Sequence, residues 1–573
     1  MKKLRTLSVV LMALVMSLSA LGCARVGPGG RGRGSSNATE ITFLQHQGTL
    51  NPDDWLKPAI KRFTELKKDE EYEAGKTGVK ISVMNAKVNY TSMPDADIVI
   101  GENQVNIYDM QSRGWLMNLD SVVEHVGLNK IDPAVVERMK GSDGKFYGMP
   151  HFSYYTGLSY NIDLFEKYGF YFAAPGALGE EHTCVFGTAT MLGVMGTEKS
   201  VGPDGIADTY DDGLPSSLQE FLILCDYIRV KGVNPFSITG AGTQPYNYGF
   251  NIVNTIWANL VGAEAMNNVY CNYSDKPVEL VKTEGGKILY TDEELFYTGS
   301  GILKPQTETV VLNDTNGYRM YDMAARYYAL AFMQMCYEKE WFCKSAWNGG
   351  SNYDAQRYVI FGANNAKAQD NSAILVDASY WYGEARQSGT LDDYNNTMFK
   401  TPNTSVMPMP VQLEGSVTEG NGKKGVQIDI GGSQLFVTTN AESSEGKARA
   451  VREFIEFLYS DSELALFTEN TGLDIPMTYT YDKSKLNALG SFYSNLQEQL
   501  EEADVIRTAS SSLRFKNNSG MLSLSWGGHT VSFRIGTLDY SSGTLYAMSQ
   551  KVKTDAIFQA TLITKGEWDT MVH

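Results

Sequence analysis

Short apolar runs alternate with longer segments of helical periodicity in the first part of the chain. Three runs have the length and composition of buried strands: residues 41–44, 79–83 and 97–100. Between the first two, Trp55, Ala59 and Phe63 recur on one helical face within the segment 54–68. A second helical stretch follows the third strand. This alternation predicts an α/β lobe with a central sheet.

The chain continues with elements that predict a second α/β lobe. A strand-like segment begins at residue 147, and a helix starts near residue 163. Further on, the segment from Asp370 reads as a buried strand that delivers three consecutive aromatic residues directly after it, namely Tyr380, Trp381 and Tyr382. No internal repeat of fixed period occurs.

Glycine and capping patterns organise the region after residue 425. The run 426–439 reads as one strand with Gly431 and Gly432 in its middle, where a backbone without side chains lets another chain or a ligand approach closely. Ser460 and Glu463 are spaced as a capping box for a helix that ends at Gly472.

Polar residues follow two strands of the first lobe. Ligands of open α/β sheets collect outside the carboxyl ends of the strands. The candidates at those ends are Gln45, His46, Gln47, Glu102 and Asn103. Any of these side chains also serves well as a helix cap or a solvated group, so both interpretations stay open.

The N-terminus has the pattern of an export signal. Three basic residues precede an apolar run over 7–16, and small residues then lead to Cys23. A cysteine directly after Gly22 is similar to a bacterial lipobox, in which that thiol carries diacylglycerol and becomes the first mature residue. An ordinary secreted protein with an incidental cysteine is the alternative. Residues 24–37 are rich in Gly, Arg and Ser and read as a flexible tether.

Composition narrows the classes of partner. Asp and Glu number 66 against 49 Lys and Arg, giving a formal charge of −17, so the basic surface of a nucleic-acid binder is not expected. Tyrosines number 33 and exceed the 24 phenylalanines, which favours rings with a polar edge at a wet recognition surface, although half-buried core tyrosines explain the count equally. The five cysteines besides Cys23 show no metal-ligand spacing.

The segment 204–213 is strongly acidic. Its carboxylates are Asp204, Asp208, Asp211 and Asp212, and Gly213 permits a sharp turn. Hard oxygen ligands at this density suit a structural Ca²⁺ ion, and a solvated turn that caps the next helix is the alternative. No other cofactor is expected.

Several sequence blocks, in their order, resemble bacterial extracellular solute-binding lipoproteins of ABC importers, specifically family 1, which includes maltose- and oligosaccharide-binding proteins. The blocks are PDADIVIG, RGWLMNLD, YGMP with YNIDLFEKYG, LPSSLQEFL with GVNPF, AILVDASYWYGEA, GGSQLFVTTNAES, AVREFIEFLYSD and TGLDIP. Together with Cys23 they span most of residues 40–476, whereas the last hundred residues match loosely and 270–312 reads as an insertion.

The resemblance implies an α/β, two-lobe periplasmic-binding-protein-like fold of type II with a hinge and a ligand cleft between the lobes. The implied divisions are a signal peptide over 1–22, a lipidated tether over 23–37, lobe one over 38–150 plus 433–478, and lobe two over 151–432 plus 479–573. Three hinge crossings are implied near 147–153, 428–435 and 475–479. Ligand binding then shifts an open-to-closed equilibrium.

The resemblance also implies ligand-binding residues. In this family, the strand that corresponds to the one starting near Asp370 is followed by an aromatic residue that stacks on a sugar. In this chain that aromatic residue is Tyr380 or Trp381. Further candidates are Tyr154, Tyr155 and Trp257, the backbone of Gly432, and the polar groups Gln45, Gln47, Glu102 and Asn103. A pyranose offers an apolar face to an aromatic ring and hydroxyls to polar groups. The alternative for each ring is a place in the core of lobe two.

We therefore expect a monomeric binding protein without enzymatic activity, anchored by its lipid outside the cell membrane, that passes an oligosaccharide to ABC permease subunits. A lipid-anchored glycoside hydrolase is the alternative of another class, and it requires two facing carboxylates such as Glu102 and Asp377. A solute other than a sugar is the third possibility.

Overall fold

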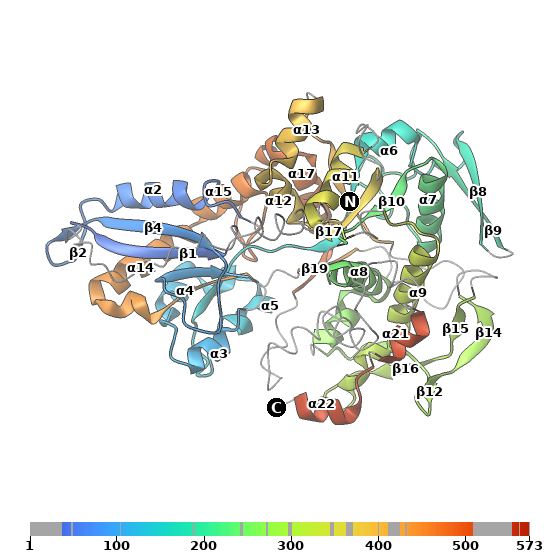
Figure 1. The fold of residues 1–573 in the computed structure, drawn as a ribbon. Helices are drawn as coiled ribbons and strands as arrows, with labels where there is room; N and C mark the ends of the chain where they lie inside the picture. The colour runs from blue at the N-terminus through green and yellow to red at the C-terminus, as the bar shows by residue number, and fades with distance from the viewer. Residues whose placement is uncertain are drawn as a thin grey trace, which may run out of the picture.

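The structure is a computed structural model. It describes residues 37–46, 50–102, 105–186, 189–240, 244–270, 273–295, 301–343, 349–362, 371–398, 400–410, 425–429, 433–507, 553–560 and 562–571. The described chain forms two α/β lobes that lie side by side (Figure 1).

Lobe one is built on a five-stranded sheet. In spatial order its strands are β4 (Val79–Ala86), β1 (Thr39–His46), β5 (Ile98–Gly101), β20 (Gln434–Val437) and β6 (Gly148–Pro150). The first three are parallel, and β20 runs antiparallel to both of its neighbours. The three strands predicted in the first hundred residues are thus confirmed. Because β20 comes from far along the chain, lobe one is completed only by the returning segment.

Helices of lobe one bury one face each against this sheet and against one another. They are α2 (Leu56–Leu66), α3 (Ile107–Ser112), α4 (Asp120–Val126), α5 (Pro133–Val136), α14 (Glu445–Leu458) and α15 (Asp461–Thr471). The periodicity of α2 buries Leu56, Ala59 and Phe63, and the Phe63 ring packs 4.9 Å from that of Phe454 on α14. A hairpin of β2 (Glu71–Glu73) and β3 (Lys76–Thr77) lies at the edge.

Lobe two is built on a four-stranded mixed sheet. Its strands are, in spatial order, β10 (Asn234–Ser237), β17 (Ser372–Ala378), β7 (Thr156–Asn161) and β18 (Thr404–Met407). The helices around it are α6 (Ile162–Tyr168), α7 (Leu218–Val230), α8 (Gln244–Met266), α9 (Ala324–Glu338), α11 (Asn352–Phe361), α12 (Trp381–Gln387), α13 (Thr390–Met398), α16 (Leu486–Leu489) and α17 (Ser491–Glu502). Every residue of β17 is buried, as its continuous apolar run predicts.

Several hairpins and short elements extend lobe two. The region predicted as an insertion folds as antiparallel pairs of β11 (Pro277–Val281) with β16 (Thr307–Val311), β12 (Thr283–Glu284) with β13 (Lys287–Ile288), and β14 (Tyr290–Glu294) with β15 (Leu303–Pro305). A further hairpin pairs β8 (Glu180–Phe186) with β9 (Ala189–Met195). The C-terminal helices are α21 (Thr554–Ala560), which contacts α9, and α22 (Lys565–Met571).

Short 3₁₀ helices link several of these elements. They are η1 (Leu128–Lys130), η2 (Glu137–Met139), η3 (Asn267–Tyr270), η4 (Gly317–Asp322), η6 (Thr439–Ser443) and η7 (Lys483–Lys485).

Three segments cross between the lobes and are hydrogen bonded to one another. The first joins β6 to β7, the second joins β19 (Val426–Asp429) to β20, and the third follows α15. The His151 N–H donates to the Ser433 carbonyl at 3.0 Å, and the Ser153 N–H donates to the Asp474 carbonyl at 2.9 Å. β19 also pairs with β21 (Asp504–Arg507). The exact lobe boundaries stay a prediction, but the sheets lie on either side of these crossings.

Two local predictions after residue 425 are wrong. The run 426–439 contains two strands, β19 and β20, that belong to different sheets, because the chain changes lobe between them. The capping box does not form either. Ser460 is the residue before α15 but makes no side-chain capping bond, because its hydroxyl donates to the Phe457 carbonyl at 2.7 Å. The Glu463 carboxylate, the other half of the expected box, pairs with Arg62 on α2.

Among the described residues, no helix has both the length and the apolar composition needed to cross a bilayer.

Candidate functional site

A pocket between the two lobes is the candidate binding site. It encloses about 310 Å³, part of which is open to solvent. Its lining residues come from the loop before α2, from α12, from the end of α15 and from α17, and are Leu50, Asn51, Asp54, Tyr380, Gly383, Arg386, Gln387, Thr471, Leu473 and Tyr493. Because its walls belong to different lobes, any relative motion of the lobes changes the size of the pocket.

An ion pair spans this pocket. Arg386 Nη2 on α12 lies 3.0 Å from Asp54 Oδ2 in lobe one, and both side chains are about one-third exposed. Burial raises the pKa of Asp54, although Arg386 acts in the opposite direction. Such a partly exposed pair contributes modestly to stability. Because the pair joins Arg386 of lobe two to Asp54 of lobe one, a change in the separation of the lobes changes the distance between these two charges.

Tyr380 supplies the aromatic wall of the pocket. Its side chain is half-buried and packs edge-on against the buried ring of Tyr154 on the first crossing, with ring centres 5.0 Å apart. Tyr154 therefore supports Tyr380 from behind. A half-buried ring supported in this way suits stacking on an apolar ligand face.

Trp381 and Trp257 do not line this pocket, and both lie in the core of lobe two, the alternative that the sequence left open. Both side chains are 0% exposed. The Trp381 Nε1–H donates to Ser159 Oγ at 2.9 Å, and its ring packs against Phe492 at 5.2 Å. Trp257 lies on α8 and points its Nε1–H at Met323 Sδ. Because Trp381 opens α12 one residue after Tyr380, the helix directs the two rings apart.

Tyr155 also has a structural role where a ligand contact was expected. Its hydroxyl donates to Asp474 Oδ2 at 2.8 Å, which joins the first and third crossings. Burial, followed by the charge of Asp474, raises the pKa of Tyr155 well above its usual range. The side chain is 3% exposed, so this tyrosine holds the crossings together.

The polar candidates of lobe one lie where the sheet predicts. Gln45 and Glu102 come at or just after the carboxyl ends of the adjacent parallel strands β1 and β5. Both are buried, and Gln45 Nε2 donates to the carbonyl of Leu50 at 2.5 Å, so it supports the loop that lines the pocket. The Glu102 N–H donates to the Tyr90 hydroxyl. Gln47, Asn103 and Gly432 lie outside the described residues.

No family model matches the chain, and no curated protein matches it. Solved structures do. One, from work on xylan utilization by Caldanaerobius polysaccharolyticus, has a TM-score of 0.52 at 14% identity and covers 91% of this chain and 99% of that chain. This match, together with the two sheets and three crossings of the present chain, identifies the architecture.

The fold is the two-lobe periplasmic-binding-protein-like fold.

The predicted fold class is thus confirmed. Two further structures are similar to this chain at lower scores. Maltose-bound MalE3 of T. maritima has a TM-score of 0.49 at 14% identity, covering 93% of this chain and 99% of that chain. An ABC-transporter binding protein of Bifidobacterium animalis in complex with mannobiose has a TM-score of 0.48 at 14% identity, covering 94% of this chain and 95% of that chain.

Sequence reasoning missed several residues of the pocket in this binding-protein fold. Asn51 and Asp54 follow β1 after a short loop, so the rule that selected Gln45 also points to them if it is extended by a few residues. Gly383 and Arg386 lie three and six positions after Tyr380 and share its side of α12, a signal that helical periodicity provides once Tyr380 is placed.

The carboxylate pair considered for catalysis is not assembled at the pocket. Asp377 is buried in lobe two beside Glu384, whereas Glu102 contacts Tyr90 in lobe one. Glu384 Oε2 accepts hydrogen bonds from Asn352 Nδ2 and Gln356 Nε2, at 3.1 and 2.9 Å. Burial, and then the neighbouring Glu384, raises the pKa of Asp377 well above its usual range.

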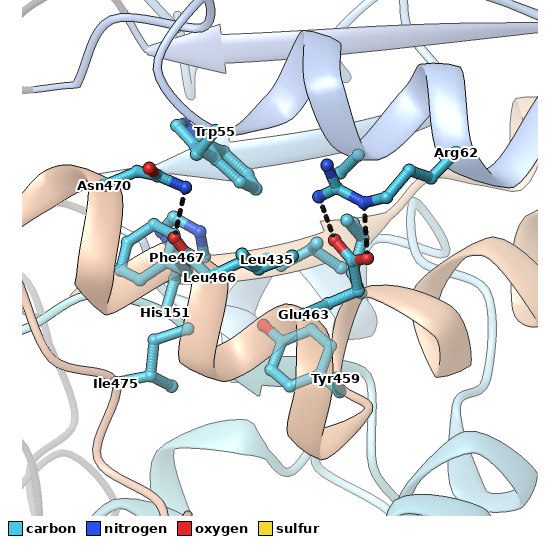
Figure 2. A pocket seen from close by; sticks show the side chains of 12 residues that line it. Trp55, Arg62, His151, Leu435, Tyr459, Glu463, Leu466, Phe467, Asn470 and Ile475 are labelled. Atoms are coloured by element: carbon cyan, nitrogen blue, oxygen red, sulfur yellow. Dashed lines mark hydrogen bonds and ion pairs between the residues drawn. The ribbon is translucent and has the colours of Figure 1, made fainter. Parts of the chain in front are cut away.

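A second pocket lies inside lobe one, beneath α2 and α15 (Figure 2). It measures about 420 Å³ with its open part included, and Trp55, His151 and Phe467 line it. Arg62 and Glu463 form a two-pronged ion pair at its side, with bonds of 2.7 and 2.6 Å. Burial lowers the pKa of His151 to about 3, so its ring is neutral. Because every lining residue belongs to lobe one or to a crossing, the interlobe pocket remains the candidate for the ligand.

The acidic loop of lobe two is held by its own hydrogen bonds. Asp211 is buried and accepts hydrogen bonds from the Asp204 N–H and from Thr209 Oγ1. Burial, and then the charges of Asp204 and Glu502, raises the pKa of Asp211 to about 7. Asp208 has a left-handed backbone with φ of 65°, and its N–H donates to Asp212. Asp204 Oδ2 and Asp212 Oδ1 are buried and accept no hydrogen bond from the described residues.

Proposed function

We propose that this chain is the extracytoplasmic solute-binding component of an ABC importer and that its solute is an oligosaccharide. The observation that carries the proposal is the pocket whose walls come from both lobes and include the half-buried ring of Tyr380. A ligand held there contacts both lobes and stabilises the closed arrangement. ABC permease subunits are the proposed partners, and the chain acts as a monomer.

The chemistry of the lining supports a sugar. Tyr380 offers an aromatic face, while Asn51 and Gln387 offer amide donors and acceptors for hydroxyl groups. Asp54 and Arg386 add a carboxylate and a guanidinium that become available when their ion pair opens. One similar structure comes from work on xylan utilization, so xylo-oligosaccharides belong among the first compounds to test.

The decisive experiment is a thermal-shift screen of the mature chain against oligosaccharides, followed by calorimetric titration of the best one. At 100 times its Kd, a ligand stabilises the folded chain by about 2.7 kcal/mol. The same oligosaccharide, end-labelled and incubated with the protein, should be recovered intact. Shortened products would favour the glycoside hydrolase alternative. If only solutes that are not sugars stabilise the chain, the proposed ligand class is wrong.

The variant Tyr380→Ala should bind the best oligosaccharide about 1–3 kcal/mol more weakly, as expected for loss of a large aromatic contact in a pocket. Its melting temperature should change little, because the ring is only half-buried. Tyr108→Ala is the matched control, since Tyr108 is 38% exposed on α3 and does not line the interlobe pocket. Equal affinities in both variants would contradict the stacking role.

The proposed membrane anchor rests on the sequence, because Cys23 lies outside the described residues. Cys23→Ser should remove the lipid attachment point and release the protein from the membrane fraction into the soluble one. Fractionation of cells that express the wild-type and variant chains measures this. Retention of the variant in the membrane would contradict the lipoprotein assignment.

We propose further that the acidic loop binds Ca²⁺ through Asp204, Asp208, Asp211 and Asp212. The proposal is supported by the two buried carboxylate oxygens that accept no hydrogen bond from described residues. Among those residues, no three carboxylate oxygens of the loop converge as closely as a bound ion requires, so calcium must draw the loop together.

Chelation should therefore lower the melting temperature, and added Ca²⁺ should restore it. The effect should be larger at pH 8 than at pH 5.5. In the metal-free chain the raised pKa of Asp211 means that its protonated form favours folding at low pH, and this contribution disappears as the pH rises through about 7. Calcium needs the ionised carboxylate, so it acts above that pH. A melting curve that chelation leaves unchanged at pH 8 would show that the loop is only a turn.

A further inference from the structure

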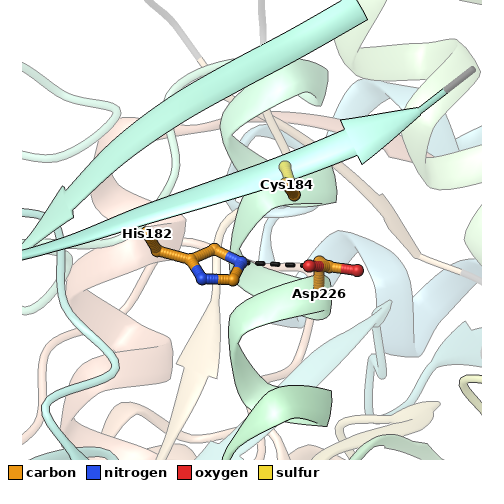
Figure 3. A group of neighbouring side chains, drawn as sticks. All are labelled: His182, Cys184 and Asp226. Atoms are coloured by element: carbon orange, nitrogen blue, oxygen red, sulfur yellow. Dashed lines mark hydrogen bonds and ion pairs between the residues drawn. The ribbon is translucent and has the colours of Figure 1, made fainter. Parts of the chain in front are cut away.

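Three side chains of different metal-binding types meet between the β8–β9 hairpin and helix α7 (Figure 3). His182 and Cys184 are two residues apart on β8, so they lie on the same side of the strand. Both are buried, whereas their neighbours Glu181, Thr183 and Val185 are exposed. Asp226 reaches the same point from α7.

The ligand atoms of this group are close together. His182 Nε2 lies 3.0 Å from Asp226 Oδ2, and the three atoms, including Cys184 Sγ, are all within 4.8 Å of one another. In a tetrahedral zinc site with bonds of about 2.0–2.3 Å, neighbouring ligand atoms are separated by about 3.3–3.6 Å. Binding of an ion therefore requires the Cys184 and Asp226 side chains to adjust to these separations. Among the described residues, no other group of three His, Cys, Asp or Glu side chains converges in this way.

We propose that His182, Cys184 and Asp226 bind a zinc ion. Imidazole, thiolate and carboxylate are all ligands that zinc accepts, and the thiolate disfavours calcium and magnesium. A water molecule completes the fourth position, because Glu180, the next residue on this side of β8, is engaged by Lys231 at 2.8 Å and by the Tyr227 hydroxyl at 3.0 Å.

The surroundings define how the ion binds. Cys184 is 2% exposed, and its thiol makes one weak hydrogen bond, to the Met191 carbonyl at 3.9 Å. Burial, and then the charge of Asp226, raises the pKa of the thiol to about 12. Binding therefore exchanges the S–H proton for a Zn–S bond and releases the proton to solvent. The Asp226 side chain is 27% exposed and the His182 side chain 10%, so the ion enters beside Asp226.

The consequence is a fastening of the hairpin to α7. In the metal-free chain, the His182–Asp226 bond links this group to the helix, and the His182 ring also packs against Tyr227 of α7, with ring centres 5.1 Å apart. With zinc bound, two residues of β8 and one of α7 share a single ion. This role is independent of the ligand pocket, because none of the three residues lines it.

The test uses the full mature chain, stripped with a chelator and then kept in excess Ca²⁺, so that the acidic loop does not interfere. Calorimetric titration with ZnCl₂ should show one equivalent bound and protons released, and the melting temperature should rise. Co²⁺ in place of zinc should give the intense near-ultraviolet absorption of a thiolate–cobalt bond. Cys184→Ser should abolish that absorption and weaken zinc binding at least about 10-fold, since even groups that only orient a ligand change affinity by about 10- to 100-fold.

Cys343→Ser is the matched control, because Cys343 is a buried cysteine whose Sγ lies 3.6 Å from Ser237 Oγ, away from this group. It should keep both the absorption and the affinity. Asp226→Asn provides a second test on a partly exposed residue if Cys184→Ser does not fold, and it too should weaken zinc binding at least about 10-fold. Absence of the thiolate–cobalt absorption in the wild-type chain, or unchanged zinc affinity in either variant, would overturn the proposal.

Discussion

Replacing Trp381 by Ala should lower the free energy of unfolding by about 3–5 kcal/mol, the range for truncating a buried Trp or Phe. The side chain is 0% exposed and packs against Phe492 and Tyr382, with ring centres 5.2 and 5.3 Å away. Truncation leaves a cavity in the core of lobe two. It also removes the Nε1–H donor of Ser159 Oγ. Chemical denaturation with the variant and the wild type measures the change.

Two neighbouring variants control for this result. Trp381→Phe keeps most of the packing but loses the hydrogen bond, so its cost should be clearly smaller than that of Trp381→Ala. Tyr380→Ala alters the next residue in the chain, which lines the pocket, and should weaken ligand binding more than folding. If Trp381→Ala folds as stably as wild type but loses ligand affinity, the indole faces the ligand and its placement in the core is wrong.

Replacing Arg507 by Met should lower the free energy of unfolding by about 3 kcal/mol, at the lower end of the range for breaking a buried ion pair. Arg507 Nη1 donates to Asp429 Oδ2 at 2.7 Å and Nε donates to Asp132 Oδ2 at 2.8 Å. Asp429 is 1% exposed, so water cannot reach its carboxylate to replace the guanidinium that the substitution removes. Arg138 is also buried and interacts electrostatically with the Asp429 carboxylate. Because this second cation remains in the variant, we expect the loss of stability to lie at the lower end of the range.

The position of Arg507 adds a second readout. Its side chain also donates to Ser153 Oγ on the first crossing, so it joins that crossing to β19 and to Asp132 of lobe one. Once an oligosaccharide ligand is identified, Arg507→Met should also change its affinity, because the crossings set the open-to-closed equilibrium. Arg449→Met is the control: that arginine pairs with Glu70 at the surface, with both side chains more than 40% exposed, and should cost less than about 1 kcal/mol. Equal, small effects of the two variants would contradict a structural role for the Arg507 network.

Local patterns in the sequence determined most of the secondary structure. Periodicity predicted α2 and its buried face, and the apolar runs predicted β1, β4, β5 and the fully buried β17. A left-handed glycine ends α15, as predicted, because Gly472 has φ of 76°. These features succeed because each depends on residues that are neighbours in the chain. Their alternation also predicted α/β architecture, whereas the two-lobe fold was implied by the resemblance of the sequence blocks to solute-binding lipoproteins.

Tertiary contacts decided which side chains form the site. Tyr380 and Trp381 are adjacent and both aromatic, so the sequence leaves both as candidates; only the packing of α12 directs one ring to the pocket and the other to the core. Glu463 has the spacing of a capping residue, yet it pairs with Arg62, about 400 positions away, because α2 packs beside α15.

Local sequence patterns therefore determined the elements of the fold, whereas long-range packing determined the proposed binding and metal sites. The sequence by itself determined the α/β elements, their order and the candidate loops at strand ends, because these follow from hydrophobic period, turn residues and sheet geometry. Only the tertiary structure split residues 426–439 between two sheets, brought Asp54 to Arg386 across the lobes, and placed Asp226 beside His182 and Cys184. Each of these depends on which distant segments become neighbours when apolar faces are buried, and that choice is made by the packing of the whole chain.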